Sequence, residues 1–230
     1  MTIFDWLERF EFLRGLPAVY LVMITAVIIM IAWDWRIVLF ALAAHYLLTG
    51  LLFVDVLDPR LAIVKVLVGL FVCLIMYITA RQVNLGKLPP DVLSEEAAEL
   101  HQEQRFAVGP LRIPATLPRR LILAPLMITA VFFLGQQPEY ALPLLDETLG
   151  HFQLAIYTLI GMGLLGMALT TEPWQAGIGL LLVLTGFELF YIVVNQALLS
   201  LALFASVNLA VAVVVAYLTQ GHRYFVAVLD

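Results

Sequence analysis

The feature that most constrains this chain is a series of apolar runs, each about as long as a helix that crosses a membrane. Of the 230 residues, 63% are hydrophobic and 13% are charged, whereas a soluble domain is about 45–50% apolar and about 25% charged. A helix of about 20 apolar residues spans the roughly 30 Å hydrocarbon core of a bilayer. The composition therefore predicts an integral membrane protein that crosses the bilayer several times.

The length and uniformity of these runs predict helices. Only helices and closed barrels satisfy every backbone polar group in lipid, and barrel strands are about ten residues long with alternating polarity. The runs here are longer and apolar throughout, so we expect an all-α polytopic membrane protein with about seven transmembrane helices. The expected spans are residues 16–33, 37–54, 61–80, 119–135, 150–170, 175–195 and 197–219.

Polar segments separate the spans. Residues 1–15 mix apolar and charged side chains, which predicts an amphipathic segment along the membrane interface. Residues 81–118 form a polar loop, in which residues 91–105, DVLSEEAAELHQEQR, predict a short helix with its acids early and Arg105 last. That helix is either a solvated surface helix or a docking site for a neighbouring subunit. The expected parts are the interfacial segment 1–15, an N-terminal three-helix part 16–80, the polar loop 81–118, a fourth helix with an outer loop 119–149, a C-terminal three-helix part 150–220 and a tail 221–230.

The basic residues predict the orientation. Loop 81–118 with its flank holds six of the twelve Lys and Arg residues, whereas 136–149 holds none. The six are Arg81, Lys87, Arg105, Arg112, Arg119 and Arg120. Because loops rich in Lys and Arg stay on the cytoplasmic side, we expect a protein of the cytoplasmic (inner) membrane with its N-terminus outside and its C-terminus inside.

Glu188 is the main candidate for a functional residue, because it lies near the middle of span 175–195. An acidic residue at a helix centre costs about 2.5–3.5 kcal/mol on insertion scales. Tyr191 and Asn195 follow Glu188 at helical spacing, so this polar stripe is expected to face protein or water. Two interpretations stay open: a carboxyl that exchanges protons, and a protonated carboxyl that makes one structural hydrogen bond.

Two further polar residues lie deep in other spans. Asn208 can contact Glu188 if the last two spans form an antiparallel hairpin, either as a link between helices or as part of a water wire. His45 is central in its span and is either a hydrogen-bonded core residue or a member of a proton path.

Lys65 lies about one turn into span 61–80. A long lysine side chain at this depth can extend to the interface with its ammonium group in water. Alternatively it pairs with Asp55 or Asp58, or it belongs to a buried proton relay.

Several kinds of site lack the residues they need. A net charge of −5 gives no electrostatic case for binding nucleic acid. Haem held by two histidines needs both at matching depth, but His45 is central in its span whereas the other three histidines lie at span edges or in loops. No cysteine cluster, HExxH motif, GxSxG elbow or glycine-rich phosphate loop occurs. We therefore expect no catalytic residue, no cofactor and no metal site in this chain.

The C-terminal part resembles a known arrangement. Residues 176–194, AGIGLLLVLTGFELFYIVV, with the spans on either side, resemble the K-type small membrane subunit of complex I and the C-type subunit of multisubunit cation/proton antiporters. That family has three helices with a buried glutamate on the second, and the matching positions here are Gly186 and Glu188. The family carries a second buried glutamate on its third helix, where this chain has only Asn208.

The longer stretch 61–220 is similar to the hydrogenase-4 component E family of membrane-bound hydrogenases, through KVLVGLFVCLIMYITARQ, LGHFQLAIYTLIGMGLL and FELFYIVV. This resemblance implies a non-catalytic subunit of a membrane oxidoreductase complex that contributes to a proton or ion path, with large antiporter-like subunits and the lipid bilayer as partners. The alternatives are an independent small-solute transporter or channel, and an assembly scaffold without a proton role.

The orientation can be tested by cysteine labelling. After removal of Cys73, single cysteines at Glu95 and Glu139 are exposed to a membrane-impermeant maleimide from outside. We expect Glu139→Cys to react and Glu95→Cys to be protected until the membrane is opened, because the basic loop lies inside. Labelling of Glu95→Cys alone would reverse the orientation.

Overall fold

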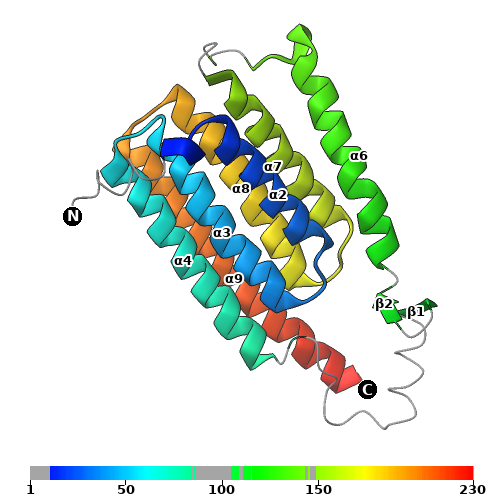
Figure 1. Ribbon diagram of the computed structural model, residues 1–230. Coiled ribbons are helices and arrows are strands. Elements are labelled where there is room, and N and C mark those ends of the chain that lie inside the picture. Colours follow the sequence, from blue (N-terminus) through cyan, green and yellow to red (C-terminus); the bar gives the residue numbers. More distant parts are fainter. Residues whose placement is uncertain are drawn as a thin grey trace.

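The computed structural model describes residues 11–83, 85, 105–108, 111–114, 116–142, 145 and 149–229. Within these residues the fold is built from seven α-helices (Figure 1). They are α2 (Leu16–Ile31), α3 (Trp35–Val54), α4 (Pro59–Gln82), α6 (Thr116–Gln136), α7 (Gly150–Ala168), α8 (Pro173–Val194) and α9 (Leu198–Leu229), with short 3-10 turns at Glu11–Leu13 and Pro138–Tyr140. The prediction of an all-α polytopic membrane protein is confirmed.

Six of these helices are long and apolar enough to cross a membrane, and α2 is the exception. With 16 residues, α2 is about 24 Å long, which is shorter than the roughly 30 Å hydrocarbon core. It nevertheless packs inside the bundle against α3 and α7. The helix ends otherwise agree with the expected spans to within a few residues, apart from α9, which continues to Leu229.

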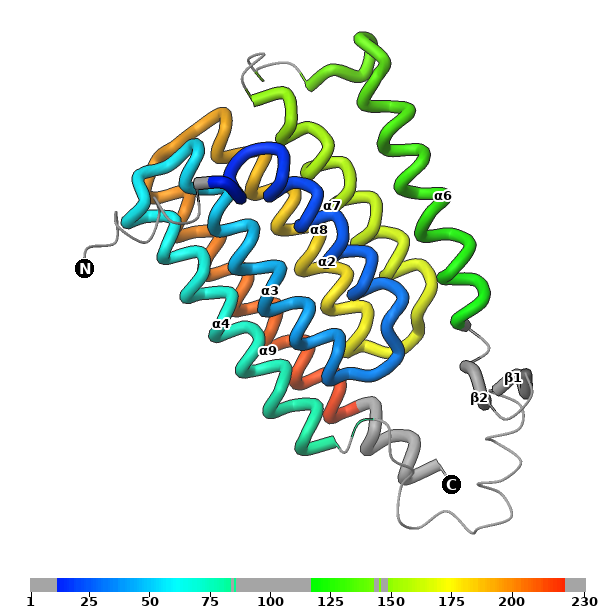
Figure 2. The backbone as a smooth tube through the Cα atoms, viewed as in Figure 1, coloured from blue at the N-terminus to red at the C-terminus, as the bar shows by residue number. Residues whose placement is uncertain are grey.

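The helices form two layers of three. Helices α2, α3 and α4 pack side by side in one layer, and α7, α8 and α9 do so in the other, with α2 against α7 and α4 against α9. Figure 2 shows α6 at one edge of the bundle, where it contacts α7 and α2. The N-terminal and C-terminal three-helix parts therefore face each other across one shared core.

Short turns between the helices follow from local sequence signals. The carboxylate of Asp34 accepts a hydrogen bond from the Arg36 backbone N–H at 2.9 Å and begins α3. In the same way Asp58 accepts from the Arg60 N–H at 2.8 Å and begins α4, with Pro59 in the first turn. Such side-chain caps satisfy backbone donors that a helix leaves free at its N-terminus.

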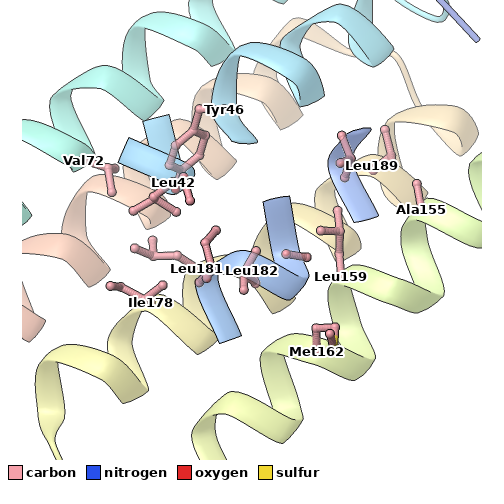
Figure 3. Packing of buried hydrophobic residues seen from close by; sticks show 14 of the residues in the cluster. Leu42, Tyr46, Val72, Ala155, Leu159, Met162, Ile178, Leu181, Leu182 and Leu189 are labelled. Atoms are coloured by element: carbon pink, nitrogen blue, oxygen red, sulfur yellow. The ribbon is translucent and has the colours of Figure 1, made fainter. Parts of the chain in front are cut away.

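Glycines bring α7 and α8 into close contact within an apolar core that Figure 3 shows in part. A Cβ atom added at Gly163 would lie 2.5 Å from the carbonyl oxygen of Gly179, and one added at Gly179 would lie 2.8 Å from that of Gly163. Both distances are too short for real atoms, so the two backbones touch only because neither position has a side chain. Small residues permit such contacts between transmembrane helices.

One prediction for the polar segments is wrong, and the rest mostly concern residues that the structure does not describe. Arg105 does not end a helix: it begins strand β1 (Arg105–Val108), which pairs antiparallel with β2 (Leu111–Pro114). Phe106, Val108 and Ile113 favour strands, and this local preference prevails over the charge pattern at Arg105. The remainder of the expected helix, residues 91–104, and residues 1–10 of the interfacial segment lie outside the described residues.

The α7–α8 contact predicts a matched pair of glycine variants. Gly163→Ala should lower the free energy of unfolding by about 1–3 kcal/mol, because the helices must separate. Gly166→Ala, one turn later, should have little effect, since its Cβ would meet its nearest neighbours at 3.6 and 3.7 Å. Thermal unfolding of both variants in one detergent provides the measurement, and equal melting temperatures would contradict the close contact.

Candidate functional site

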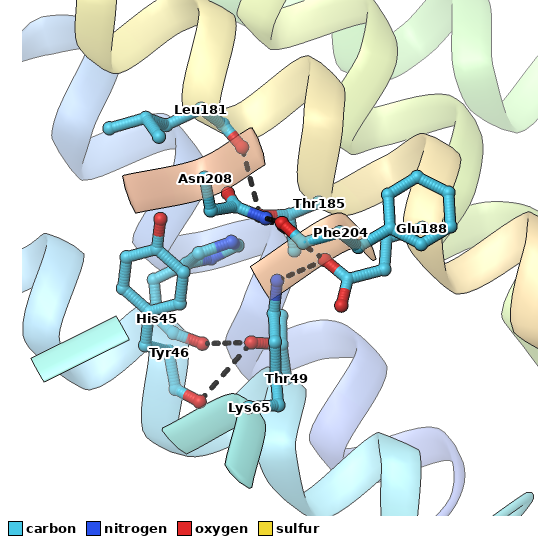
Figure 4. Close-up of polar contacts among 9 residues, drawn as sticks. All are labelled: His45, Tyr46, Thr49, Lys65, Leu181, Thr185, Glu188, Phe204 and Asn208. Atoms are coloured by element: carbon cyan, nitrogen blue, oxygen red, sulfur yellow. Dashed lines mark hydrogen bonds and ion pairs between the residues drawn. The ribbon is translucent and has the colours of Figure 1, made fainter. Parts of the chain in front are cut away.

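The centre of the candidate site is an ion pair between Lys65 of α4 and Glu188 of α8. The Lys65 ammonium donates to the Glu188 Oε2 atom (Figure 4). Both side chains are buried, with 2% and 1% of their surface exposed. The pair joins residues that are 123 positions apart in the sequence and connects the two layers of the bundle.

This pairing corrects two of the interpretations of Lys65. The side chain does not extend to the interface, because it is buried among α3, α4 and α8. It does not pair with Asp55 or Asp58 either. Asp55 is bound by Arg14, with 2.8 Å between Nη2 and Oδ1, and Asp58 caps α4.

Asn208 of α9 completes the contacts of the carboxylate. Its Nδ2 donates to Glu188 Oε2 at 3.3 Å and to the Phe204 carbonyl at 2.9 Å. Helices α8 and α9 are consecutive and pack together, so the contact arises as the antiparallel hairpin predicts. The Oδ1 atom of Asn208 is buried and has no hydrogen-bond partner among the described residues.

Aromatic rings of α3 cover the lysine. The Lys65 Nζ atom lies 5.4 Å from the centre of the Tyr46 ring and 5.8 Å from that of the Phe53 ring, within the range of cation–π attraction. Gly69 makes this arrangement possible, because any Cβ at that position would overlap the Tyr46 ring. Neither ring was predicted from the sequence to contact Lys65. The sequence feature that could have indicated them is Gly69, one helical turn after Lys65, because a glycine within a helix permits another helix to approach closely.

His45 lies deeper in α3 and is fully buried. Its Nδ1 atom is 3.2 Å from the hydroxyl of Thr25 on α2, and that hydroxyl donates to the Val22 carbonyl at 2.8 Å. The histidine is thus hydrogen-bonded in the core, and within the described residues no hydrogen bond joins it to Lys65 or Glu188. The His45 Nε2 and Tyr46 Oη atoms are buried without a hydrogen-bond partner there. Thr185 is one polar neighbour of the Tyr46 hydroxyl.

Tyr191 and Asn195 lie on the far side of Glu188, toward the end of α8. The Asn195 Nδ2 atom is 3.4 Å from the Tyr191 Oη atom, and Asn195 is exposed. The Tyr191 ring packs edge-on against that of Phe204, with 5.4 Å between ring centres. Across the described part of the chain no hydrogen bond links Tyr191 to Glu188, so the expected polar stripe divides into a buried group and a surface group.

The ion pair lies off the centre of the helices. Glu188 is six residues before the last residue of α8, Val194, and Lys65 is six residues after the first residue of α4, Pro59. These two helix ends lie on the same side of the bundle (Figure 1). At 1.5 Å per residue, the pair is about 9 Å from that end, whereas His45 is nine residues, or about 14 Å, from the end of α3 at Val54.

Comparisons of the chain with models of protein families, with curated proteins and with solved structures find no match. The resemblance of residues 61–220 to the component E family therefore stays a hypothesis, and the site is interpreted from its own residues.

The ion pair predicts strong coupling between two substitutions. Lys65→Gln and Glu188→Gln should each lower the free energy of unfolding by about 3–5 kcal/mol, because each leaves a buried charge without its partner. The double variant should recover most of that loss, since two amides of similar length can hydrogen-bond to each other. Unfolding in mixed micelles of mild detergent and dodecyl sulfate gives the four free energies, and additive losses would show that the two side chains do not interact.

Proposed function

We propose that this chain is a membrane subunit of a complex I-like or membrane-bound hydrogenase-like assembly, in which Lys65 and Glu188 form a proton-exchange site. The observation that carries the proposal is the buried ion pair between two helices of different layers. Ionisable residues inside transmembrane segments mark proton and ion pathways in many membrane proteins.

The stability of the fold alone does not explain why a buried ion pair, rather than a pair of apolar side chains, occupies this position. Replacing a buried ion pair by well-packed apolar residues is often neutral or stabilising by about 1–4 kcal/mol. The neighbours of Lys65 and Glu188 include Tyr46, Phe53 and Leu189, all buried, so an apolar pair would suit the surroundings. The presence of two opposite charges at this place favours a role in chemistry rather than in packing.

The pair can hold a mobile proton at two atoms. A proton that reaches the Glu188 carboxylate neutralises it and removes the counter-charge of the Lys65 ammonium. Lys65 can then pass on a proton and become neutral, which returns the site to zero net charge. The amide of Asn208 donates to the carboxylate and holds it in place while the lysine moves. The buried polar atoms of His45, Tyr46 and Asn208 that have no hydrogen-bond partner among the described residues are suited to internal water molecules, which such groups commonly bind.

The depth of the polar residues suggests a direction for the path. His45 lies farther from the α4 start and α8 end than the ion pair does, while Tyr191 and Asn195 lie between Glu188 and that surface. Under the orientation expected from the basic loop, that surface is the outer one. Entry at Glu188 and release from Lys65 would then carry a proton from the Asn195 side toward the region of His45.

The place in a larger assembly rests on the resemblance and on two outer helix faces. The last three helices resemble the K-type small membrane subunit, and Glu188 occupies the position of its buried glutamate. Where that family has a second glutamate, this chain has Asn208 and takes its second ionisable group, Lys65, from α4. Helices α6 and α9 present large apolar side chains outward, which suit neighbouring membrane subunits as well as lipid.

The double variant Lys65→Gln/Glu188→Gln tests the proton role. We expect the variant to assemble in normal amounts, because both charges are removed together, and to reduce the pH gradient formed in energised membrane vesicles at least tenfold. The gradient is normalised to the amount of assembled complex. A gradient equal to that of the native protein in the double variant would assign the pair to packing alone.

Two further variants sharpen this test. Lys65→Arg keeps the positive charge but cannot release a proton, so it should also lose the gradient. Asn208→Leu should reduce the gradient by a smaller factor, because an amide orients the carboxylate or water without holding the proton. Arg81→Gln, at the exposed end of α4, serves as the control and should leave the gradient unchanged.

A further inference from the structure

A second buried charge lies at the opposite end of the bundle from the ion pair. Arg120, in the first turns of α6, is 8% exposed. Its Nη1 atom donates to the Met30 carbonyl at 3.4 Å, and its Nη2 atom donates to Gln175 Oε1. Its Nε atom is buried and has no hydrogen-bond partner among the described residues.

The guanidinium group has no counter-charge among the residues that the structure describes. Within the described part of the chain, no carboxylate lies within ion-pair distance of Arg120. Its two acceptors are neutral, and Gln175 Oε1 also accepts from the Thr170 hydroxyl at 3.1 Å. Glu172 acts on Arg120 electrostatically but is exposed and forms no ion pair with it. Buried charges in proteins are almost always paired, so this guanidinium has capacity for an anion.

A small cavity adjoins the guanidinium. Its volume is about 30 Å³, which exceeds the roughly 10–15 Å³ that one water molecule needs by this measure. Met30, Met162, Gly166, Gln175 and Gly179 line it together with Arg120. The space exists where α7 and α8 carry glycine, and it is otherwise mostly apolar.

We propose that this cavity binds one small monovalent inorganic anion, of the size of chloride, against the Arg120 guanidinium. A spherical ion with a single charge needs few donors and fits a space of one or two water molecules. Carboxylates, sulfate and phosphate have several oxygen atoms that each need a donor, and the mostly apolar lining does not supply them. The site ties α6 to the bundle, because Arg120 reaches from α6 to α2 and α8.

The test compares the melting temperature of the full-length chain in sodium chloride and in sodium gluconate at equal ionic strength. A fluorescent protein fused to the C-terminus follows this chain alone, with or without accompanying subunits. Chloride and bromide should raise the melting temperature by about 3 °C, with saturation as the concentration rises, whereas gluconate and sulfate should not. Equal melting temperatures in all four salts would overturn the proposal.

Variants locate the effect. Arg120→Gln should abolish the difference between chloride and gluconate, whereas Arg119→Gln should keep it, because Arg119 binds the Leu169 carbonyl and does not line the cavity. Persistence of the difference in Arg120→Gln would place the anion elsewhere and overturn the proposal.

A third variant covers the case in which Arg120→Gln does not fold. Glu172→Gln removes a negative charge that acts on Arg120 and should lower the chloride concentration for half of the effect by about threefold. An unchanged or higher concentration would count against the site.

Discussion

The buried contact between Lys65 and Glu188 is the interaction on which the arrangement of the bundle depends. Each charge is tolerable in this interior only beside the other, so α4 and α8 must meet at one depth and with one rotation. The Tyr46 and Phe53 rings then cover the ammonium group, and Asn208 fixes α9 against the carboxylate. Four helices are thereby positioned by one pair of opposite charges, whereas apolar contacts alone would permit several lateral arrangements.

Polar contacts at the two ends of the bundle complement this ion pair. At one end Arg14 holds Asp55, which connects the start of α2 with the end of α3. At the other end Arg119 and Arg120 donate to carbonyl groups near the ends of α7 and α2, where helix termini leave acceptors free and carry partial negative charge. Between these ends the helices are matched mainly by shape, and α7 and α8 approach closely at Gly163 and Gly179.

The sequence predicted the helices well because lipid imposes the rule: each run must be apolar and about 20 residues long. The contact of Asn208 with Glu188 could also be predicted, because a short turn makes α8 and α9 neighbours. The partner of Lys65 could not be predicted, because it lies 123 residues away and hydropathy does not encode the lateral order of the helices. Arg105 was assigned wrongly, since a short polar segment carries too weak a pattern to separate helix from strand. From the sequence, Arg120 indicated only the orientation of the chain in the membrane. Its burial could not be predicted, because that depends on how α6 packs against the bundle.

The long sequence separation of the ion pair has a consequence for biosynthesis. A ribosome that adds about 5–20 residues per second incorporates Lys65 about 6–25 s before it reaches Glu188, 123 residues later. During that interval the nascent chain holds Lys65 in a membrane segment without Glu188, its partner in the finished protein. Lys65 lies only six residues from the start of its helix, so its ammonium can rest among the lipid headgroups until α8 is inserted. The interfacial position of the Lys65 side chain, which the folded protein does not adopt, would then be the position in the unfinished chain. When α8 is inserted, Glu188 attracts the ammonium group inward and the two layers pack together.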